Sequence, residues 1–477
     1  MKLVLLSGGS GKRLWPLSND CRSKQFLKVL KHPEKAIQES MVQRVWRQLT
    51  QSGLSGDAYI ATSKSQQEML QSQLGMEVPL IVEPERRDTF PAIALAAVYL
   101  YSMEAVPLDE VVVVLPVDPF VDQPFFEKLK ELEQAVRSEQ AELTLMGVRP
   151  THPSEKYGYI VPEAGVVDQQ NPLVSADCAS SVCRVHRFQE KPSESQAIEL
   201  IGQKALWNCG VFAFRMNTFI QMLMQRGLPI QYEAMVKQYS RMKKISFDYE
   251  VVEKTSNIAV IPYEGRWKDL GTWNTLTEEM NDPVMGKGIL SEDARNTHLI
   301  NELDIPVTII GLSNVVVATS PDGILVTDKT QSPRIKEVLP SHSTRPMYEE
   351  RRWGSYRVID YSKLEGEGEV LTKRIRIAAG HNLSYQWHEK RSEVWTILSG
   401  RGRCILDGEL KEVRGGDVIV IPVGAKHSIR ALEELEIIEV QRGSELIEED
   451  IVRESLHWEE IMALGSRKGD FTHAIGE

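Results

Sequence analysis

The sequence is poor in cysteine, carries no excess of positive charge and contains no long hydrophobic run. Its five cysteines are scattered and odd in number, and Cys178 and Cys183 lack the C-x-x-C spacing of a zinc knuckle. This usage is typical of a reducing cytoplasm. The net charge of −11 argues against a general nucleic-acid binder, since phosphate backbones select for a basic face.

No apolar run is long enough to span a bilayer, and the N-terminus leads directly into a strand pattern without a small-residue cleavage site. We therefore expect a cytoplasmic protein with no membrane partner and no nucleic-acid partner. The two common nucleotide fingerprints are also missing. A Walker loop would need other residues where Leu6 and Arg13 stand, and G-x-G-x-x-G fails because no third glycine follows Gly11.

What the sequence does contain is a strand that runs straight into a glycine-rich loop. Residues 3–7 (LVLLS) are an apolar β-type run, and residues 8–13 (GGSGKR) follow at once. Glycines let the backbone approach an anion closely, and free N–H groups at a helix start face it. Basic residues in and after the loop, Arg22 among them, add positive charge. An ordinary turn is the alternative, but we favour phosphate binding by Gly8, Gly9, Gly11, Lys12, Arg13 and Lys24.

At 477 residues the chain exceeds one typical core, so we expect two or three domains. Apolar residues at every fourth position from Ile37 to Leu49 predict one apolar helix face, and residues 89–103 are too apolar for a surface helix. Alternating strands and helices predict a mostly parallel sheet covered on both faces, with ligands beyond the carboxyl ends of its strands. The predicted strands include 58–62, 79–84, 111–118 and 143–148.

From about residue 285 the helical periodicity disappears. Residues 307–326 hold short β-rich runs separated by glycine and Pro-Asp-Gly turns. After a polar connector at 329–345, glycines punctuate apolar strands at regular short intervals, which suggests a sandwich or barrel.

The first loop also resembles a known family. LSGGSGKRLWPLS followed by SKQFL is similar to the pyrophosphorylase loop of sugar-nucleotide transferases, and Trp15 with KQFL resembles the mannose-1-phosphate guanylyltransferases. The usual loop has threonine where Lys12 stands and proline where Ser23 stands. The resemblance implies an α/β, Rossmann-like (GT-A-like) nucleotidyltransferase with a mixed sheet, a short left-handed β-helix linker and an all-β cupin barrel. The expected domains are 1–284, 285–340 and 341–477.

Two aspartates are candidates for a divalent cation. Asp118 ends a buried strand, where a carboxylate is costly unless it is solvated or binds a cation. Magnesium favours one or two carboxylates plus substrate phosphates, so the phosphate loop points to Mg²⁺; a turn or capping aspartate is the alternative. Asp269, in GRWKDLGTW, is the second candidate. The resemblance supports both, because they stand in the family's P-x-D and W-x-D-x-G-x-W elements.

Further strings supply polar groups for a sugar phosphate and a base. FQEKP carries Glu190, which suits a sugar hydroxyl, and Lys191, which suits a phosphate, although such a pair alone more often marks a solvated face. In the family, YGYI with Gly158 and WNCGVF with Asn208 line the sugar pocket. Asp88, in ERRDTFPAIALAA, replaces the usual asparagine of the family's base-contacting segment and can still accept from guanine N–H groups.

The resemblance implies a Mg²⁺-dependent in-line displacement that makes GDP-mannose. A phosphate oxygen of α-D-mannose 1-phosphate attacks the α-phosphorus of GTP, and pyrophosphate leaves. The nucleophile is already anionic, so catalysis should rest on positioning and charge neutralisation. We expect Arg13 and Lys24 on the triphosphate and Lys191 on the sugar phosphate. The predicted catalytic residues are Arg13, Lys24, Asp118 and Lys191, with Mg²⁺ on Asp118 and Asp269.

The C-terminal segment resembles a cupin of the phosphomannose-isomerase type, with one motif at 380–400 and another at 416–427. The first motif of the two-domain mannose enzymes has a histidine where Lys390 stands, and a lysine ammonium is a poor metal ligand. Two interpretations stay open. One is a mixed nitrogen–oxygen site for Zn²⁺ or Co²⁺ that interconverts mannose 6-phosphate and fructose 6-phosphate; the other is a structural or dimerising barrel without metal. The candidate ligands are Gln386, His388, Glu393 and His427.

The leading hypothesis is a cytoplasmic guanylyltransferase that joins GTP and mannose 1-phosphate and forms a homodimer or higher homo-oligomer. One rival keeps the fold but uses another base or hexose. The other is a catalytically dead sugar-nucleotide sensor or assembly subunit, against which both candidate metal aspartates argue.

Overall fold

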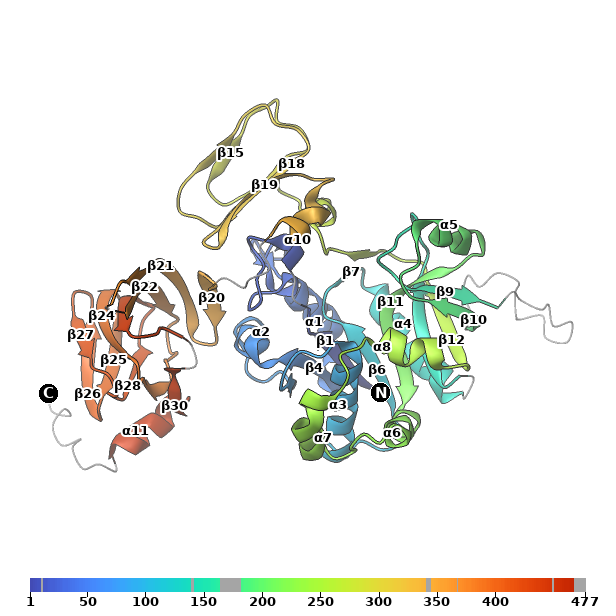
Figure 1. The fold of residues 1–477 in the computed structure, drawn as a ribbon, viewed down its shortest axis with the longest axis horizontal. Helices are drawn as coiled ribbons and strands as arrows, with labels where there is room; N and C mark the ends of the chain where they lie inside the picture. The colour runs from blue at the N-terminus through green and yellow to red at the C-terminus, as the bar shows by residue number, and fades with distance from the viewer. Residues whose placement is uncertain are drawn as a thin grey trace, which may run out of the picture.

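The chain folds into three successive units (Figure 1). A nine-stranded sheet comes first, a small set of parallel strands follows, and two antiparallel sheets close the chain. None of the helices in the described part of the chain is long and apolar enough to cross a membrane. The computed structural model describes residues 1–9, 12–138, 141–163, 182–339, 345–366, 368–447 and 450–466. Two residues named in the sequence analysis, Gly11 and Cys178, therefore lie outside the described part of the chain.

The N-terminal sheet is mixed. β1 (Lys2–Ser7) lies parallel between β4 (Ala58–Ser63) and β6 (Val111–Pro116). β11 (Leu206–Arg215) runs antiparallel to β6 and to β8 (Leu143–Val148). The prediction of a mostly parallel sheet therefore holds for the half around β1, whereas in the other half only β8 and β12 (Ile258–Tyr263) pair in parallel among the described strands. Strand direction depends on long connections that periodicity does not reveal. The remaining strands are β5 (Leu80–Glu83), β9 (Tyr159–Pro162) and β10 (Cys183–Gln189).

Helices cover both faces of this sheet. Leu3 of β1 belongs to a core shared with α1 (Met41–Gln51) and α4 (Pro124–Arg137). Val4, which points the opposite way, belongs to a core shared with α3 (Thr89–Ser102). Nearly all of α3 is buried, as its apolar sequence predicted. The two-sided covering confirms the α/β class and leaves the strand ends free to carry a site.

Helix α1 begins later than its periodicity predicted. Ser40 and Gln43 form a reciprocal capping box, which satisfies free backbone N–H groups and fixes the helix start. Val45 and Leu49 face the core as expected. Ile37 lies before the helix and is exposed, so its prediction as part of the apolar face was wrong.

A small parallel β-structure follows the sheet. β14 (Val284–Met285), β16 (His298–Asn301) and β18 (Val315–Ser320) pair in parallel, as do β15 (Gly288–Leu290) and β17 (Val307–Ile309). Parallel strands stacked through short turns are the arrangement that the predicted β-helix requires. β19 (Gly323–Asp328) returns antiparallel to β18.

Two antiparallel sheets face one another at the C-terminal end around a core that includes Trp395, Ile429 and Ile437. This is the predicted all-β, cupin-like sandwich. One sheet contains β20 (Tyr348–Arg351), β21 (Gly354–Leu364), β22 (Gly368–Ile377), β29 (Leu435–Gly443), β24 (Arg391–Ser399) and β27 (Val418–Ile421). The other contains β26 (Glu409–Arg414), β25 (Arg401–Leu406), β28 (His427–Ala431), β23 (Tyr385–Trp387) and β30 (Val452–Ser455).

The first and last units touch along α2 (Gln67–Leu74) and β20. Glu350 of β20 lies 3.1 Å from the Lys28 ammonium and accepts a hydrogen bond from Gln73 at 3.4 Å. Glu68 of α2 lies 3.7 Å from the Arg351 guanidinium. The C-terminal unit therefore rests on the same stretch of chain that follows the glycine-rich loop.

Candidate active sites

A cavity of about 400 Å³ opens at the carboxyl ends of β1 and β6. Gly8 and Gly9 follow β1 directly, and Asp118 follows β6. Because these strands are parallel neighbours, their ends meet at one edge of the sheet. The cavity brings together seven of the predicted residues: Gly8, Gly9, Asp88, Asp118, Gly158, Glu190 and Asn208.

The two candidate metal aspartates converge on one ammonium group. Lys24 Nζ lies 3.0 Å from Asp118 Oδ2 and 2.5 Å from Asp269 Oδ1. The pairing of β7 (Pro119–Val121) with β13 (Trp267–Asp269) brings them together, because Asp269 stands opposite the residue after Asp118. Burial alone would raise the pKa of Asp269, but Lys24 holds it below its usual range. Two carboxylates that converge on one positive charge also suit a divalent ion.

The glycine-rich loop is held by polar contacts with its neighbours. The Ser23 hydroxyl donates to the Gly9 carbonyl at 2.5 Å, and Gln66 Nε2 donates to Ser23 Oγ at 2.5 Å. Burial raises the pKa of Asp269, Lys24 lowers it, and the charge of Arg13 lowers it further, so Arg13 lies within electrostatic range of this carboxylate. Of Lys12 only the backbone is described, as the start of a short 3-10 helix (Lys12–Leu14).

Arg22 does not serve as a phosphate cation in this arrangement. Its guanidinium is buried and bonds both carboxylate oxygens of Glu302 at 2.8 Å. This bidentate pair ties the loop segment to the parallel β-structure. The interpretation of Arg22 as a phosphate-type cation was therefore wrong, because a partner 280 residues away already satisfies its charge.

The predicted sugar end of the cavity contains a chain of polar groups. A Cβ on Gly158 would lie 2.5 Å from Glu190 Oε2, so only glycine fits there. Asn208 Nδ2 donates to Asp248 at 2.7 Å, and Asn208 Oδ1 accepts from the Gly210 N–H at 3.0 Å. Lys191 is half exposed; its Nζ lies 2.5 Å from Glu190 and does not line the cavity.

Two acidic residues of this cavity were missed. Burial, with the charge of Glu190, raises the pKa of Asp248 to about 7. At the predicted base end, burial raises the pKa of Glu83, whose carboxylate accepts from the Tyr239 hydroxyl at 2.6 Å. Asp88 caps α3 through a bond from the Thr89 N–H at 2.8 Å. The sequence feature that could have pointed to them is an acidic residue at a strand or helix end. This feature is also common at solvated turns, so it does not identify a buried site.

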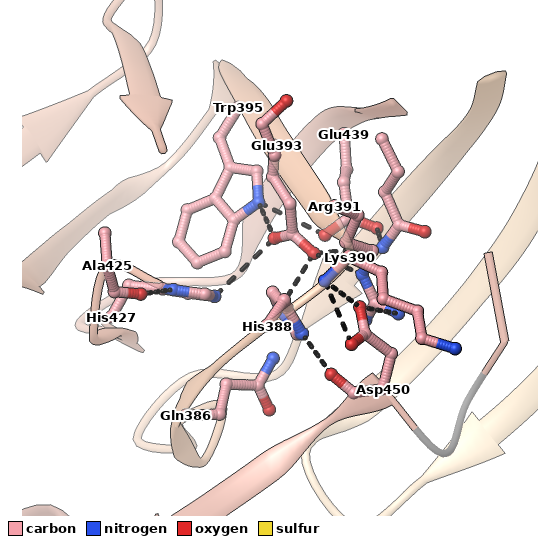
Figure 2. Close-up of polar contacts among 12 residues, drawn as sticks. Gln386, His388, Lys390, Arg391, Glu393, Trp395, Ala425, His427, Glu439 and Asp450 are labelled. Carbon is pink, nitrogen blue, oxygen red and sulfur yellow. Dashed lines mark hydrogen bonds and ion pairs between the residues drawn. The ribbon is translucent and has the colours of Figure 1, made fainter. Parts of the chain in front are cut away.

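A second cluster lies inside the C-terminal sandwich (Figure 2). His388, Glu393 and His427 are buried, and one potential ligand atom of each lies within 4.8 Å of the others. His388 Nδ1 donates to the Asp450 carbonyl at 3.0 Å and His427 Nδ1 to the Ala425 carbonyl at 2.9 Å, because a carbonyl only accepts. Each Nε2 atom of a neutral ring is then left with a lone pair, and within the described part of the chain neither has a hydrogen-bond partner.

This cluster fits a metal ion. The two Nε2 atoms lie 3.0 and 3.6 Å from the Glu393 carboxylate. Burial lowers the pKa of His427, which favours the neutral ring that a metal requires. Backbone carbonyls that fix the second ring nitrogen are the usual outer support of a histidine ligand. Gln386 stands opposite His427 in the β23–β28 pair.

Lys390 lies outside the ligand cluster. Its Nζ pairs with Glu445 at 2.7 Å on the surface, and this pairing raises the pKa of Lys390. Figure 2 shows its side chain directed away from His388 and His427. A lysine at this position therefore removes none of the three converging ligand atoms.

Residues beside the ligands were also missed. Trp395 Nε1 donates to Glu393 and to Glu439 at 3.1 Å, and Gln441 Nε2 donates to both at 3.1 and 2.9 Å. Burial, with the charge of Glu393, raises the pKa of Glu439 to about 8. Arg391 Nε donates to Glu393 at 3.2 Å. The sandwich interior is thus polar at the end that carries the cluster.

The chain matches the nucleotidyl transferase family over residues 2–284 and the mannose-6-phosphate isomerase C-terminal family over residues 341–455. A mannose-1-phosphate guanylyltransferase of Salmonella montevideo is 30% identical, covering 94% of this chain and 98% of its own length. Xanthan biosynthesis protein XanB of Xanthomonas campestris is 31% identical, covering 94% and 97%. A crystal structure described as a mannose-1-phosphate geranyltransferase from Thermus thermophilus has a TM-score of 0.56 at 28% identity, covering 71% of this chain and 97% of that one. The chain therefore belongs to the nucleotidyl transferase family, in the two-domain form with a mannose-6-phosphate isomerase C-terminal domain.

Proposed function

We propose that this chain is a mannose-1-phosphate guanylyltransferase, which makes GDP-mannose and pyrophosphate from GTP and mannose 1-phosphate. The full-length similarity to a relative of that name supports the nucleotide and sugar phosphate substrates. The convergence of Asp118 and Asp269 on one cation, beside a glycine loop and a cavity of about 400 Å³, carries the proposal.

The proposed reaction is a single in-line displacement. An oxygen of the sugar phosphate forms a bond to the α-phosphorus of GTP, and the bond from that phosphorus to the bridging oxygen breaks. Pyrophosphate leaves with the electron pair, and no proton has to be removed from the nucleophile. The protein therefore contributes alignment and fixed charge.

Each predicted residue has a proposed task in this displacement. Both families are typically metal-dependent. Asp118 and Asp269 would hold Mg²⁺, which when bound supplies positive charge to the phosphate oxygens. Lys24 and Arg13 would then face the triphosphate, and Glu190 with Asn208 the sugar hydroxyls. Lys191 does not line the cavity but contacts Glu190, which does, so a change of its side-chain conformation would bring it to the sugar phosphate.

The remaining predictions are kept as proposals. The two family matches support a division into 1–284, 285–340 and 341–477. We also propose a homodimer or higher homo-oligomer and a cytoplasmic location.

Pyrophosphate release tests the substrate pair. We would assay the full chain with Mg²⁺ and each nucleoside triphosphate against mannose, glucose and galactose 1-phosphates. GTP with mannose 1-phosphate should give the highest kcat/KM. A higher value for another pair would favour the rival that keeps the fold and changes the substrate. Binding of GTP without any turnover would favour a non-catalytic sensor.

We further propose that the C-terminal unit interconverts mannose 6-phosphate and fructose 6-phosphate. The specific observation is the buried trio His388, Glu393 and His427 with its two free lone pairs. Zn²⁺ or Co²⁺ bound there would polarise the substrate carbonyl. The reaction moves one proton between C2 and C1 and one between the two oxygens, so it needs no oxidant.

Isomerase activity should appear when the metal-free chain receives Zn²⁺ or Co²⁺. Formation of fructose 6-phosphate from mannose 6-phosphate is the measurement. His427→Ala should abolish it and leave pyrophosphate release unchanged. Equal rates with and without the histidine would favour a structural or dimerising barrel.

A further inference from the structure

Positive charges gather where the cupin cavity meets the N-terminal unit. The cavity that contains Gln386 and Glu393 has a volume of about 70 Å³. Its wall includes Glu68 of α2, so both units contribute to it. The basic residues of this wall are Arg351, Arg352, Lys373, Arg391 and Arg453.

Three of these cations already have acidic partners. Arg391 Nε bonds Glu393 at 3.2 Å. Lys373 Nζ lies 4.0 Å from Glu439. Arg351 lies 2.5 Å from Glu349. Each of these three cations therefore has a carboxyl group within ion-pair distance.

Arg352 and Arg453 differ from the other three. Among the described residues, neither has an acidic partner within ion-pair distance, and Arg352 has a single bond, to the Leu456 carbonyl at 3.3 Å. Burial lowers the pKa of Arg352, the charge of Glu68 raises it, and the charge of Arg453, with a smaller effect, lowers it again. Glu68 acts on Arg352 through space, but no carboxylate of the described residues forms an ion pair with either guanidinium group, so their N–H donors can bind an anion.

The arginine pair lies beside the candidate metal ligands. Arg453 of β30 stands opposite Gln386 of β23 in the strand register, and Gln386 stands opposite His427 on its other side. Arg352 occupies the turn between β20 and β21. The cavity is thus lined by one member of the ligand cluster, Glu393, and by the two arginines, while His388 and His427 lie behind Glu393 at 3.0 and 3.6 Å.

We propose that Arg352 and Arg453 bind the phosphoryl group of a sugar phosphate whose carbonyl end faces His388, Glu393 and His427. This assignment rests on the proposed isomerase function and names the anchor of its substrate. Guanidinium groups bind phosphate oxygens through paired N–H donors, which also orients the rest of the molecule. The present volume accommodates a phosphoryl group, and the long arginine side chains must move outward to admit the sugar.

Substitution of Glu68 tests the proposal in the opposite direction, because it should strengthen phosphate binding where the arginine substitutions weaken it. Its carboxylate belongs to the N-terminal unit, lies 3.7 Å from Arg351 and lines the same cavity. A carboxylate at the mouth repels an incoming phosphate. Removing its charge should strengthen phosphate binding, although Glu68 lies in the other catalytic unit.

Calorimetric titration of the full chain with inorganic phosphate tests the anion site. GTP is present throughout, so that phosphate does not report on the N-terminal cavity. Arg352→Gln and Arg453→Gln should each raise the dissociation constant roughly 10-fold or more. Glu68→Gln should lower it. Arg403→Gln, an exposed arginine that pairs with Glu412 at 3.6 Å, is the matched control and should leave it unchanged.

The outcomes separate this proposal from the isomerase proposal. Unchanged phosphate affinity in both arginine variants, or no phosphate binding by the wild type, overturns the anion site. Weaker phosphate binding by Glu68→Gln than by the wild type would contradict the position of Glu68 beside the proposed anion site. Loss of phosphate affinity in the arginine variants, without isomerase activity in the wild type, supports the anion site and contradicts the isomerase. Unchanged pyrophosphate release in every variant shows that the chain is folded.

Discussion

At the scale of single residues, the predicted sugar end of the N-terminal cavity brings acidic side chains so close together that the charge of one disfavours ionisation of the other. Asp248, Glu190 and Asn208 share a polar chain in which Asn208 Oδ1 is already engaged by a backbone N–H. A hydroxyl of the substrate is therefore left with the carboxylates as its main acceptors. Asp248 is half-buried, and desolvation together with the charge of Glu190 raises its pKa.

Asp248→Asn should change how stability depends on pH. The pKa of about 7 in the folded chain lies above the ordinary value, so folding takes up a proton between about pH 4 and 7. Stability from this group is therefore lost as the pH rises through that window. Asn retains the acceptor for Asn208 without the charge, so the variant should be more stable at pH 8 by roughly 1–3 kcal/mol, because cavity water screens part of the effect.

Urea unfolding at pH 5 and pH 8 measures this difference. The advantage of Asp248→Asn should shrink at pH 5. Asp109→Asn, at an exposed site, is the control and should show no such trend. An advantage equal at both pH values would contradict the assigned titration.

Ser23→Ala should weaken GTP binding. The Ser23 hydroxyl donates to the Gly9 carbonyl at 2.5 Å and so holds the loop that we propose binds the phosphates of GTP. One net hydrogen bond corresponds to a rise in KM for GTP of roughly 2- to 12-fold. Because Ser23 touches no reacting atom, kcat should change less than KM. Initial-rate kinetics at saturating mannose 1-phosphate separate the two, and a loss confined to kcat would contradict this positioning role.

At the scale of elements, the parallel β-structure is fastened to the loop segment by the Arg22–Glu302 pair. Arg22→Ala would leave the Glu302 carboxylate without its bidentate partner. Because Glu302 is partly exposed, we expect a loss of roughly 1–3 kcal/mol in the free energy of unfolding.

A double-mutant cycle with Glu302→Gln checks this pair. The two single variants and the double variant should lose similar stability, because each removes the same contact. Additive losses would show that the two side chains act separately.

The elements differ in how far the sequence could predict them. The glycine loop, the strands around β1 and the apolar helix α3 follow from local pattern, because each is determined by its own residues. Asp118 followed from its place at the end of a buried strand, and the resemblance supported both Asp118 and Asp269. Their convergence depends on β7 and β13 pairing across the fold. Asp248 and Glu83 were missed because only tertiary burial distinguishes them from solvated turn acids.

Strand β29 illustrates why the cupin interior was harder to predict. Leu435, Ile437, Glu439 and Gln441 are all buried, whereas Ile438 and Val440 lie on the outer face. The period of two predicts that these sets face opposite ways, but polarity alone would assign Glu439 and Gln441 to solvent. The side chains of β29 that point into the sandwich change from apolar to polar along the strand, because the strand ends beside the ligand cluster.

At the scale of the whole molecule, two candidate metal centres lie in units that touch at α2 and β20. Each centre is built within one unit, so a metal ion bound to the cupin should stabilise that unit alone. A ligand present at about 100 times its dissociation constant adds about 2.7 kcal/mol to the folded state.

Calorimetric scans with and without a chelator check this independence. Removing Zn²⁺ or Co²⁺ should lower the melting temperature of one transition and leave the other in place. His388→Asn should show the lower temperature whether metal is present or not. Equal shifts of both transitions would contradict separate centres.

The most direct test of the account is pyrophosphate release from GTP and mannose 1-phosphate in Asp118→Asn, Asp269→Asn and the double variant. If the two acids hold one magnesium ion together, each single variant should lose at least about 100-fold in kcat/KM, and the double variant should lose little more. Near-normal turnover in either single variant, with its fold intact, would contradict the shared metal site.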